Sequence, residues 1–98
     1  MAHRLAPGAA AELDTIWYYV ATGSGSAEIA DRLIDAITER FVLLAHFPQM
    51  GRRREDLRPG LRSFPVGEYV VLYRIEGSDV LILHVVHGHR DIEARSGS

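Results

Sequence analysis

The stretch that decides the fold is residues 61–87, LRSFPVGEYVVLYRIEGSDVLILHVVH. Three apolar runs rich in β-branched and aromatic residues are separated here by two tight turns, Gly67-Glu68 and residues 76–79. Glycine at the first position of a two-residue turn is typical of a β-hairpin. The stretch therefore predicts three consecutive antiparallel strands, at residues 61–66, 69–75 and 80–87.

Two amphipathic helices precede these strands. Pro7 suits the first turn of a helix, because its missing N–H would have no partner there. The stripe of the first helix is Leu13, Ile16, Trp17 and Val20. Residues 22–26 then predict a turn, with Ser26 as the N-cap of a second helix that ends at Phe47-Pro48. The apolar face of that second helix is Ala30, Leu33, Ile34, Ile37, Phe41 and Leu44.

A short strand at residues 3–6 completes the set of predicted elements, while the polar residues 49–60 are expected to form a loop. The predicted fold class is α+β, a helical hairpin packed on a small, antiparallel-dominated four-stranded sheet in the order β-α-α-β-β-β. A chain of 98 residues has room for one domain, which we place at residues 1–94. Residues 95–98 are predicted to be a flexible tail or a non-native remnant.

The composition points to a folded cytoplasmic protein. Apolar residues make up 47% of the chain and charged residues 24%, a balance typical of globular domains. There is no cysteine, which excludes disulfides and thiolate metal sites. The longest apolar run, residues 80–86, is interrupted by His84 and is too short to cross a bilayer, so we expect no membrane insertion.

The basic charge is local. The net charge of −2 disfavours a general nucleic-acid binder, and we expect no sequence-specific DNA binding by this chain alone. Residues 52–74 nevertheless hold six arginines against three acids. The run Arg52-Arg53-Arg54 can be a solvated loop paired with Glu55-Asp56, or a contact surface for a partner. All eleven cations are arginine, which fits either a coding bias or a need for forked donors.

The last two predicted strands are apolar on both faces. Two helices can cover one face of the sheet, and this pattern motivates the hypothesis that a second chain covers surface on the other. The alternative is a curved sheet with tyrosine hydroxyls at the surface.

The pattern His84-x-x-His87-x-His89 raises the question of a metal site. Strand alternation sends His84 and His87 to opposite faces, so we expect neither a metal nor another cofactor.

Six motifs follow one another from Leu5 to Asp91: Leu5-Ala6-Pro7, Phe47-Pro48-Gln49-Met50-Gly51, Arg52 to Leu57, Gly60 to Tyr69, Tyr73-Arg74 and His87-Gly88-His89-Arg90-Asp91. In order and spacing they resemble the ParE family of the RelE/ParE superfamily. Single pieces such as Phe-Pro carry little weight, but their joint order over most of the chain is specific.

This resemblance implies the toxin of a type II toxin–antitoxin system, held inactive by a ParD-like antitoxin in a hetero-oligomer. ParE members are associated with inhibition of DNA gyrase by binding, which would make the chain a non-enzyme. RelE-like members of the same fold are ribosome-dependent mRNA endoribonucleases, and that is the alternative function. A third possibility is a relative that has lost its activity and only binds its partner.

The nuclease alternative needs a base, an acid and cations near the scissile phosphate. RelE-like nucleases take these from lysines, arginines and a tyrosine near the C-terminus, whereas this chain has no lysine and no tyrosine after Tyr73. Its candidates would be Arg62, Arg74, His87 and Arg90. For contact with the antitoxin or target, the candidates are Trp17, Tyr18, Ile34, Phe41, Arg52, Arg53, Arg54, Arg62, Tyr73, Arg74, Arg90 and Asp91.

Overall fold

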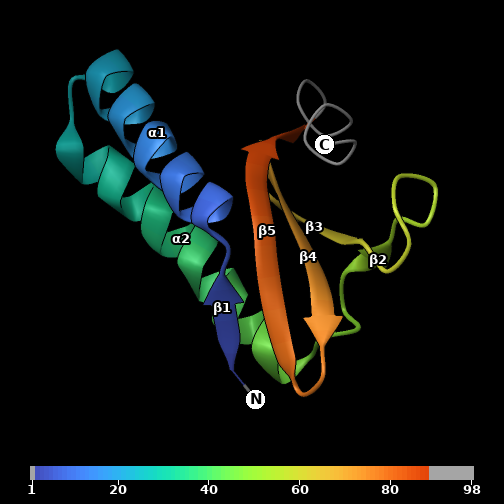
Figure 1. Cartoon of the computed structure of the whole chain (residues 1–98). Coiled ribbons are helices and arrows are strands. Elements are labelled where there is room, and N and C mark those ends of the chain that lie inside the picture. Colours follow the sequence, from blue (N-terminus) through green and yellow to red (C-terminus); the bar gives the residue numbers. More distant parts are fainter. Residues whose placement is uncertain (1, 89–98) are drawn as a thin grey trace.

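The computed structural model describes residues 2–88, as two helices beside one mixed sheet (Figure 1). The elements in chain order are β1 (His3–Leu5), α1 (Pro7–Ser24), α2 (Ala27–His46), β2 (Arg52–Arg53), β3 (Arg62–Val66), β4 (Tyr69–Glu76) and β5 (Asp79–His87). The α+β class and the β-α-α-β-β-β order of the main elements are confirmed. The strands at 61–66, 69–75 and 80–87 were predicted to within one residue at each end.

Capping residues set the start and end of the two helices in the hairpin. Pro7 occupies the first turn of α1, and Gly25 ends the helix in the left-handed conformation, with φ 71°. The side chain of Ser26 caps α2 by accepting a hydrogen bond from the backbone N–H of Ile29 at 3.2 Å. The predicted turn at residues 22–26 was too long, because α1 continues through Ser24.

The sheet has five strands in the order β1-β5-β4-β3-β2, so the prediction of four strands was wrong. The additional strand is β2, which pairs antiparallel with β3 through Arg52–Ser63 and Arg53–Arg62. Its two residues lie in a stretch that the sequence predicted as loop, since so short a strand has no periodicity to detect. β1 runs parallel to β5, and the remaining pairs are antiparallel.

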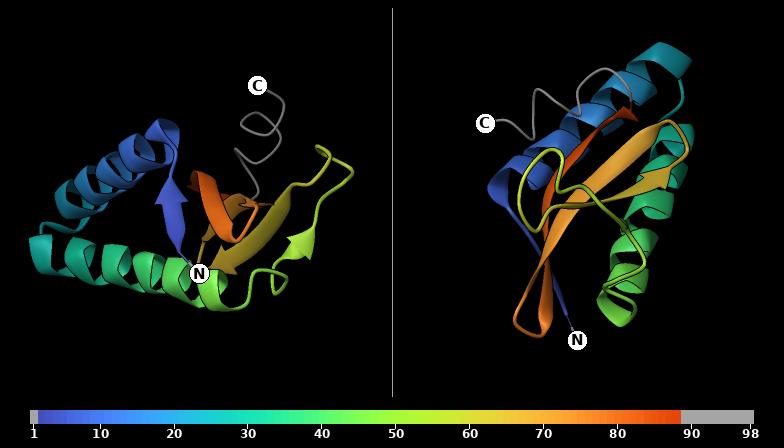
Figure 2. Two further views of the ribbon diagram at one scale, coloured as in Figure 1. Left: turned by 60° about the horizontal axis from the view of Figure 1, so that its bottom comes forward. Right: turned by 90° about the vertical axis from the view of Figure 1, so that its right-hand side faces the viewer.

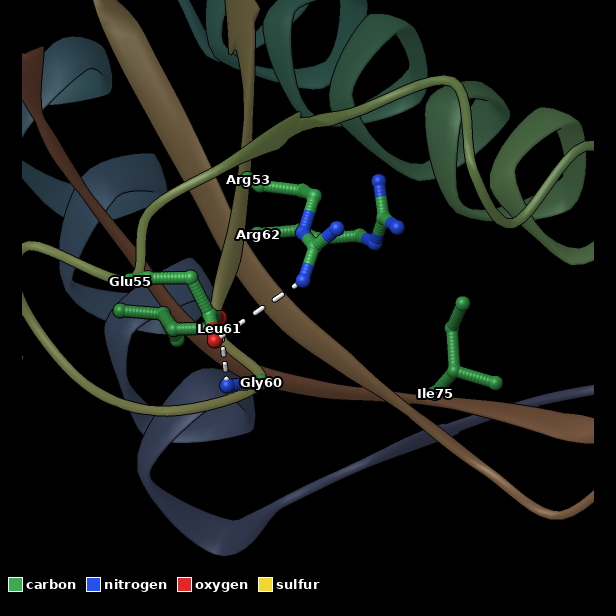
Figure 3. A pocket seen from close by; sticks show the side chains of 6 residues that line it. All are labelled: Arg53, Glu55, Gly60, Leu61, Arg62 and Ile75. Carbon is green, nitrogen blue, oxygen red and sulfur yellow. Dashed lines mark hydrogen bonds and ion pairs between the residues drawn. The ribbon is translucent and has the colours of Figure 1, made fainter.

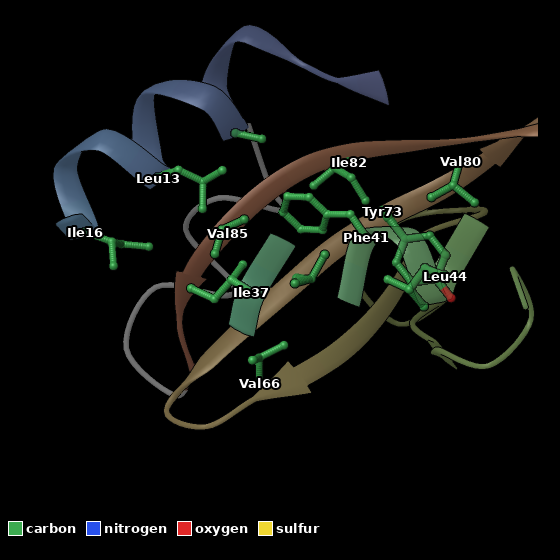
Figure 4. Close-up of a cluster of buried hydrophobic side chains, with 12 residues drawn as sticks. Leu13, Ile16, Ile37, Phe41, Leu44, Val66, Tyr73, Val80, Ile82 and Val85 are labelled. Carbon is green, nitrogen blue, oxygen red and sulfur yellow. The ribbon is translucent and has the colours of Figure 1, made fainter. Parts of the chain in front are cut away.

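The main hydrophobic core lies between the helical hairpin and the sheet (Figure 4). Phe41 is at its centre, 1% exposed, and its ring lies 5.7 Å from that of His3 on β1. Tyr73 from β4 is completely buried in the same cluster. The helices thus cover one face of the sheet, as their apolar stripes predict.

The opposite face is covered by the chain itself. The segment between β2 and β3 turns back over the sheet, on the side away from the helices (Figure 2). Leu57 and Leu61 from this segment pack with Leu72, Val86 and their neighbours in a second, smaller cluster. Both faces of β4 and β5 are therefore covered, and on this face residues 54–61 provide part of the cover, which no sequence pattern indicates.

A β-bulge at Leu83 separates two parts of β5. Before the bulge, the outer edge of β5 pairs with β1. After the bulge, Glu12 on α1 binds this edge: its carboxylate accepts hydrogen bonds from the backbone N–H of Val85 and from Nδ1 of His84, both at 3.1 Å. The register pairs His84 with Leu72 and His87 with Tyr69, and the two histidine side chains have different neighbours: that of His84 contacts Glu12 on α1, and that of His87 lies against the ring of Tyr69.

Neither helix among residues 2–88 is long and apolar enough to cross a membrane.

Candidate partner-binding surface

A hydrogen-bonded clamp fixes the segment that leaves α2. The hydroxyl of Tyr73 donates to the carbonyl of Pro48 at 2.7 Å and accepts from the backbone N–H of Gly51 at 2.8 Å. Burial raises the pKa of Tyr73, so this hydroxyl stays protonated and can make both bonds. A Cβ on Gly51 would lie 2.2 Å from the Tyr73 oxygen, and for this reason only glycine fits the approach.

Arg62 reinforces the same segment from β3. Its Nη1 donates to the carbonyl of Gly51 at 2.9 Å and to that of Gln49 at 3.3 Å. The cross-strand register places Arg53, Arg62 and Tyr73 in one row, and residues paired in this way project to one face. That face is the one covered by the helices, which end before they reach this corner of the sheet (Figure 1).

The predicted arginine run divides into different roles. Arg54 makes a bidentate ion pair with Asp56, with both hydrogen bonds at 3.1 Å. Its side chain is only 17% exposed, so this pair stabilises the loop between β2 and β3. The hydrogen bond from Arg54 lowers the pKa of Asp56. Arg52 and Arg53 on β2 are exposed, and the side chain of Arg53, 70% exposed, reaches only to 4.0 Å from Glu55. Arg52 and Arg53 therefore remain available to a partner.

Arg53 and Arg62 border a shallow hollow of about 210 Å³ (Figure 3). The two side chains extend side by side from paired positions, and Ile75 of β4 stands on the far side of the hollow. The carboxylate of Glu55 is turned to the backbone N–H of Gly60, which it binds at 2.8 Å. The hollow thus combines two guanidinium groups with an apolar wall.

Ile75 also borders a second hollow, of about 660 Å³, on the side of the α2–β2 connection. Its lining is largely apolar and includes Phe47, Pro48 and Met50. Phe47 is 60% exposed, an unusual exposure for a side chain of that size. None of Phe47, Met50 and Ile75 was among the predicted contact residues, although the cluster of apolar residues after the end of α2 could have suggested them.

Arg74 lies on the other face of β4 from Ile75, in an ion-pair network at the end of the sheet. It binds Glu76 at 2.5 Å, and Glu76 is bound in turn by Arg4 at 2.8 Å. Both arginines lower the pKa of Glu76, chiefly by hydrogen bonding to its carboxylate. Arg74 is thereby engaged within the chain.

The predicted contact residues on the helices and in the core fall into two groups. Tyr18 is 67% exposed, whereas Trp17 is half-buried and its Nε1 donates to Asp31 of α2 at 2.7 Å. Ile34 is half-buried against the core. Phe41 and Tyr73 are buried core residues, 1% and 0% exposed, so in this structure their side chains lie beneath the surface.

The nuclease candidates within residues 2–88 do not converge. Arg62 pairs with Tyr73 and His87 pairs with Tyr69, which places them four residues apart along β4, a separation of about 13 Å. Arg74 projects to the face opposite to Arg62. The remaining candidate, Arg90, lies with Asp91 outside the described residues, as does His89.

The described residues form a small α+β domain with an open, arginine-bordered surface. The comparisons with known proteins identify it: residues 4–92 match the family model described as the ParE toxin of the type II toxin–antitoxin system parDE. The chain belongs to this ParE toxin family.

Individual relatives agree with this assignment. The chain is 40% identical to Toxin ParE3 of Caulobacter vibrioides over 86 residues, which cover 88% of this chain and 85% of that protein. It is 37% identical to Toxin ParE1 of the same organism, with 97% of each chain covered, and 30% identical to Toxin ParE1 of Mycobacterium tuberculosis, with 91% of each covered. The fold matches a structure titled "Chromosomal ParDE TA system from P. aeruginosa" with a TM-score of 0.78 and 25% identity, covering 89% of this chain and 95% of that one.

Proposed function

We propose that this ParE-family toxin is neutralised by a ParD-type antitoxin and that, when free, it inhibits DNA gyrase by binding rather than by catalysis. The antitoxin partner is supported by the family description and by the fold match to a structure titled as a ParDE system. The gyrase target is what membership in this family implies. The two partners would meet in the cytoplasm.

The observation that carries the binding mechanism is the dispersal of the three nuclease candidates within residues 2–88. Acid–base cleavage of RNA needs its proton-transfer groups and cations within hydrogen-bonding reach of one phosphate. Here Arg62 holds the backbone of the α2–β2 connection, Arg74 is paired with Glu76, and His87 lies at the other end of β4. The open surface around Arg53 and Ile75 favours contact with a macromolecule.

The decisive test is a supercoiling assay with purified gyrase, run beside a ribosome-programmed mRNA cleavage assay on the same antitoxin-free protein. We expect inhibited supercoiling, or trapped double-strand breaks, with the RNA intact. Prior addition of a ParD-type antitoxin should restore supercoiling. Cleaved RNA with unaffected gyrase would establish the endoribonuclease instead, and inactivity in both assays would leave a chain that only binds its partner.

A further inference from the structure

We infer that the outer face of α1 docks on DNA gyrase, where a lysine or arginine side chain of the enzyme is held by the rings of Tyr18 and Tyr19 and by the carboxylate of Asp14. This inference rests on the proposed function, since it assigns a contact surface to the proposed target. We call this surface the α1 face; it is lined by Asp14, Thr15, Tyr18, Tyr19 and Thr22.

The first step is the exposure of two aromatic rings. The α1 face is an open hollow of about 570 Å³. Tyr18 and Tyr19 are 67% and 72% exposed, the highest values among the large apolar and aromatic side chains of residues 2–88. Tyrosine is enriched in protein interfaces, because it offers a large contact area at a low cost in conformational entropy. The two rings therefore mark a contact surface.

The second step is an unpaired carboxylate beside these rings. Asp14 lies one helical turn before Tyr18, so the two side chains project from the same side of α1. Among residues 2–88, the carboxylate of Asp14 makes neither a hydrogen bond nor an ion pair. α1 itself contains no lysine, arginine or histidine, and its other acid, Glu12, is turned to the backbone N–H of Val85. No cation of α1 therefore competes with a partner for Asp14.

The third step is the chemistry of the ligand. The face of a tyrosine ring attracts the charged group of lysine or arginine, and a carboxylate adds a charge-assisted hydrogen bond. The hydroxyls of Thr15 and Thr22 already donate to the carbonyls of Ala11 and Tyr18, at 3.1 and 2.8 Å, so they add no charge to the hollow. The complementary partner side chain is therefore a cation.

Charge also selects the kind of partner. Residues 1–51 hold three arginines against six acids, so the half of the chain that contains both helices is negative. An enzyme that holds DNA presents lysine and arginine side chains, because these neutralise the phosphates. Gyrase is such an enzyme, and its cationic surface complements the α1 face.

The α1 face lies away from the arginine-bordered surface. α1 packs on β5 and β1, at one edge of the sheet, whereas β2 with Arg52 and Arg53 forms the opposite edge (Figure 1). The two surfaces have opposite charge, so they suit different partners.

Two changes to the α1 face, each with a matched control, test the inference. Asp14→Lys reverses the charge of the face, and Glu39→Lys makes the same change at an exposed acid on α2. Tyr18→Ala combined with Tyr19→Ala removes both rings, whereas Tyr18→Phe combined with Tyr19→Phe keeps the rings and removes only the hydroxyls. All four positions are exposed, so we expect each variant to fold, which thermal unfolding verifies.

The measurements are inhibition of supercoiling by purified gyrase and the Kd for a full-length ParD-type antitoxin. We expect Asp14→Lys and the double alanine variant each to raise the toxin concentration for half-maximal inhibition by about tenfold or more. Glu39→Lys and the double phenylalanine variant should stay within about twofold of the wild type, because the ring faces and the carboxylate are intact. All four variants should bind the antitoxin within about twofold of the wild type.

The outcomes separate the two proposals. If the wild type does not inhibit gyrase, the proposed function is wrong and this inference fails with it. If the wild type inhibits and the folded Asp14→Lys and double alanine variants inhibit within twofold of it, gyrase docks elsewhere and only the inference is overturned. An equal loss in Glu39→Lys would overturn it as well, since the effect would then be one of net charge. A parallel loss of antitoxin binding would assign the α1 face to the antitoxin and likewise overturn the inference.

Discussion

The two faces of the sheet are covered in different ways. Among residues 2–88, twelve buried residues from both helices and three strands form one cluster on the helix side, whereas the opposite cluster has three and is covered by a loop. Buried apolar area is the main source of folding free energy, so the helix side carries most of the stability.

The loop side owes its shape mainly to hydrogen bonds within the loop. The backbone N–H of Arg54 donates to the carbonyl of Leu61 at 2.8 Å, and that of Leu57 donates to the carbonyl of Arg54 at 3.0 Å. The Arg54–Asp56 pair and the Glu55–Gly60 bond add to this. Changes to the loop should therefore affect partner binding more than they affect folding.

The largest effect on folding is expected from Phe41→Ala. The ring is 1% exposed at the centre of the helix-side core, and its removal leaves a cavity that the surrounding strands and helices cannot fill. We expect a loss of about 3–5 kcal/mol in the free energy of unfolding. Urea denaturation followed by circular dichroism measures it, and a loss below about 1 kcal/mol would contradict the assignment of this face as the main core.

Gly51→Ala is expected to cost about 2–3 kcal/mol, because the added Cβ would have to displace the Tyr73 hydroxyl, which lies 2.2 Å from its position. Gly23→Ala on α1 is the matched control, since its Cβ would meet nothing within 4 Å. Alanine is preferred to glycine within a helix by about 0.5–1 kcal/mol, so the control should be slightly stabilised.

The same denaturation experiment compares these two variants directly. Equal stability of both would show that the α2–β2 connection can move away from Tyr73, and the hollow lined by Phe47, Pro48 and Met50 would then not have a fixed wall.

A smaller effect is expected from Leu57→Ala on the loop side. Leu57 is half-buried and packs on the small cluster, so its truncation should lower the free energy of unfolding by about 1 kcal/mol. A loss as large as that of Phe41→Ala would show that the two faces contribute equally to the free energy of unfolding.

The sequence predicted the helix-side face well and the loop side poorly. The stripes on both helices and the turn at Gly67 are local signals, and each appears where its periodicity or turn chemistry indicates. β2 has only two residues, and its pairing with β3 is decided by tertiary contacts. No local pattern shows that Leu57 and Leu61 will fold back over β4 and β5.

The candidate surface was predicted only in part. The arginine run was found from its charge, but the exposure of Arg53 and the internal pairing of Arg54 depend on where β2 ends. Phe41 is a contact candidate as part of a groove along the helices and Tyr73 as part of the Tyr73-Arg74 motif, yet both lie at apolar positions of a helix or strand, and the structure buries them in the core. The role of Gly51 follows only from the position of Tyr73, 22 residues later.

The smallest effect concerns the exposed ion pairs of Glu76 at the end of the sheet. Arg74 and Arg4 lower the pKa of Glu76 below its ordinary value of 4.5, so the unfolded chain binds this proton more readily than the folded chain does. The stabilisation is therefore complete above about pH 4.5 and is lost as the pH falls through the lowered pKa.

Glu76→Gln lacks this titration but leaves the other carboxylates unchanged. The Tm of the wild type should thus exceed that of Glu76→Gln near neutral pH, and the difference should shrink as the pH falls below 4.5. In a background of Arg4→Ala and Arg74→Ala the difference should vanish; a difference that is constant with pH would show that these exposed pairs do not contribute to stability through Glu76.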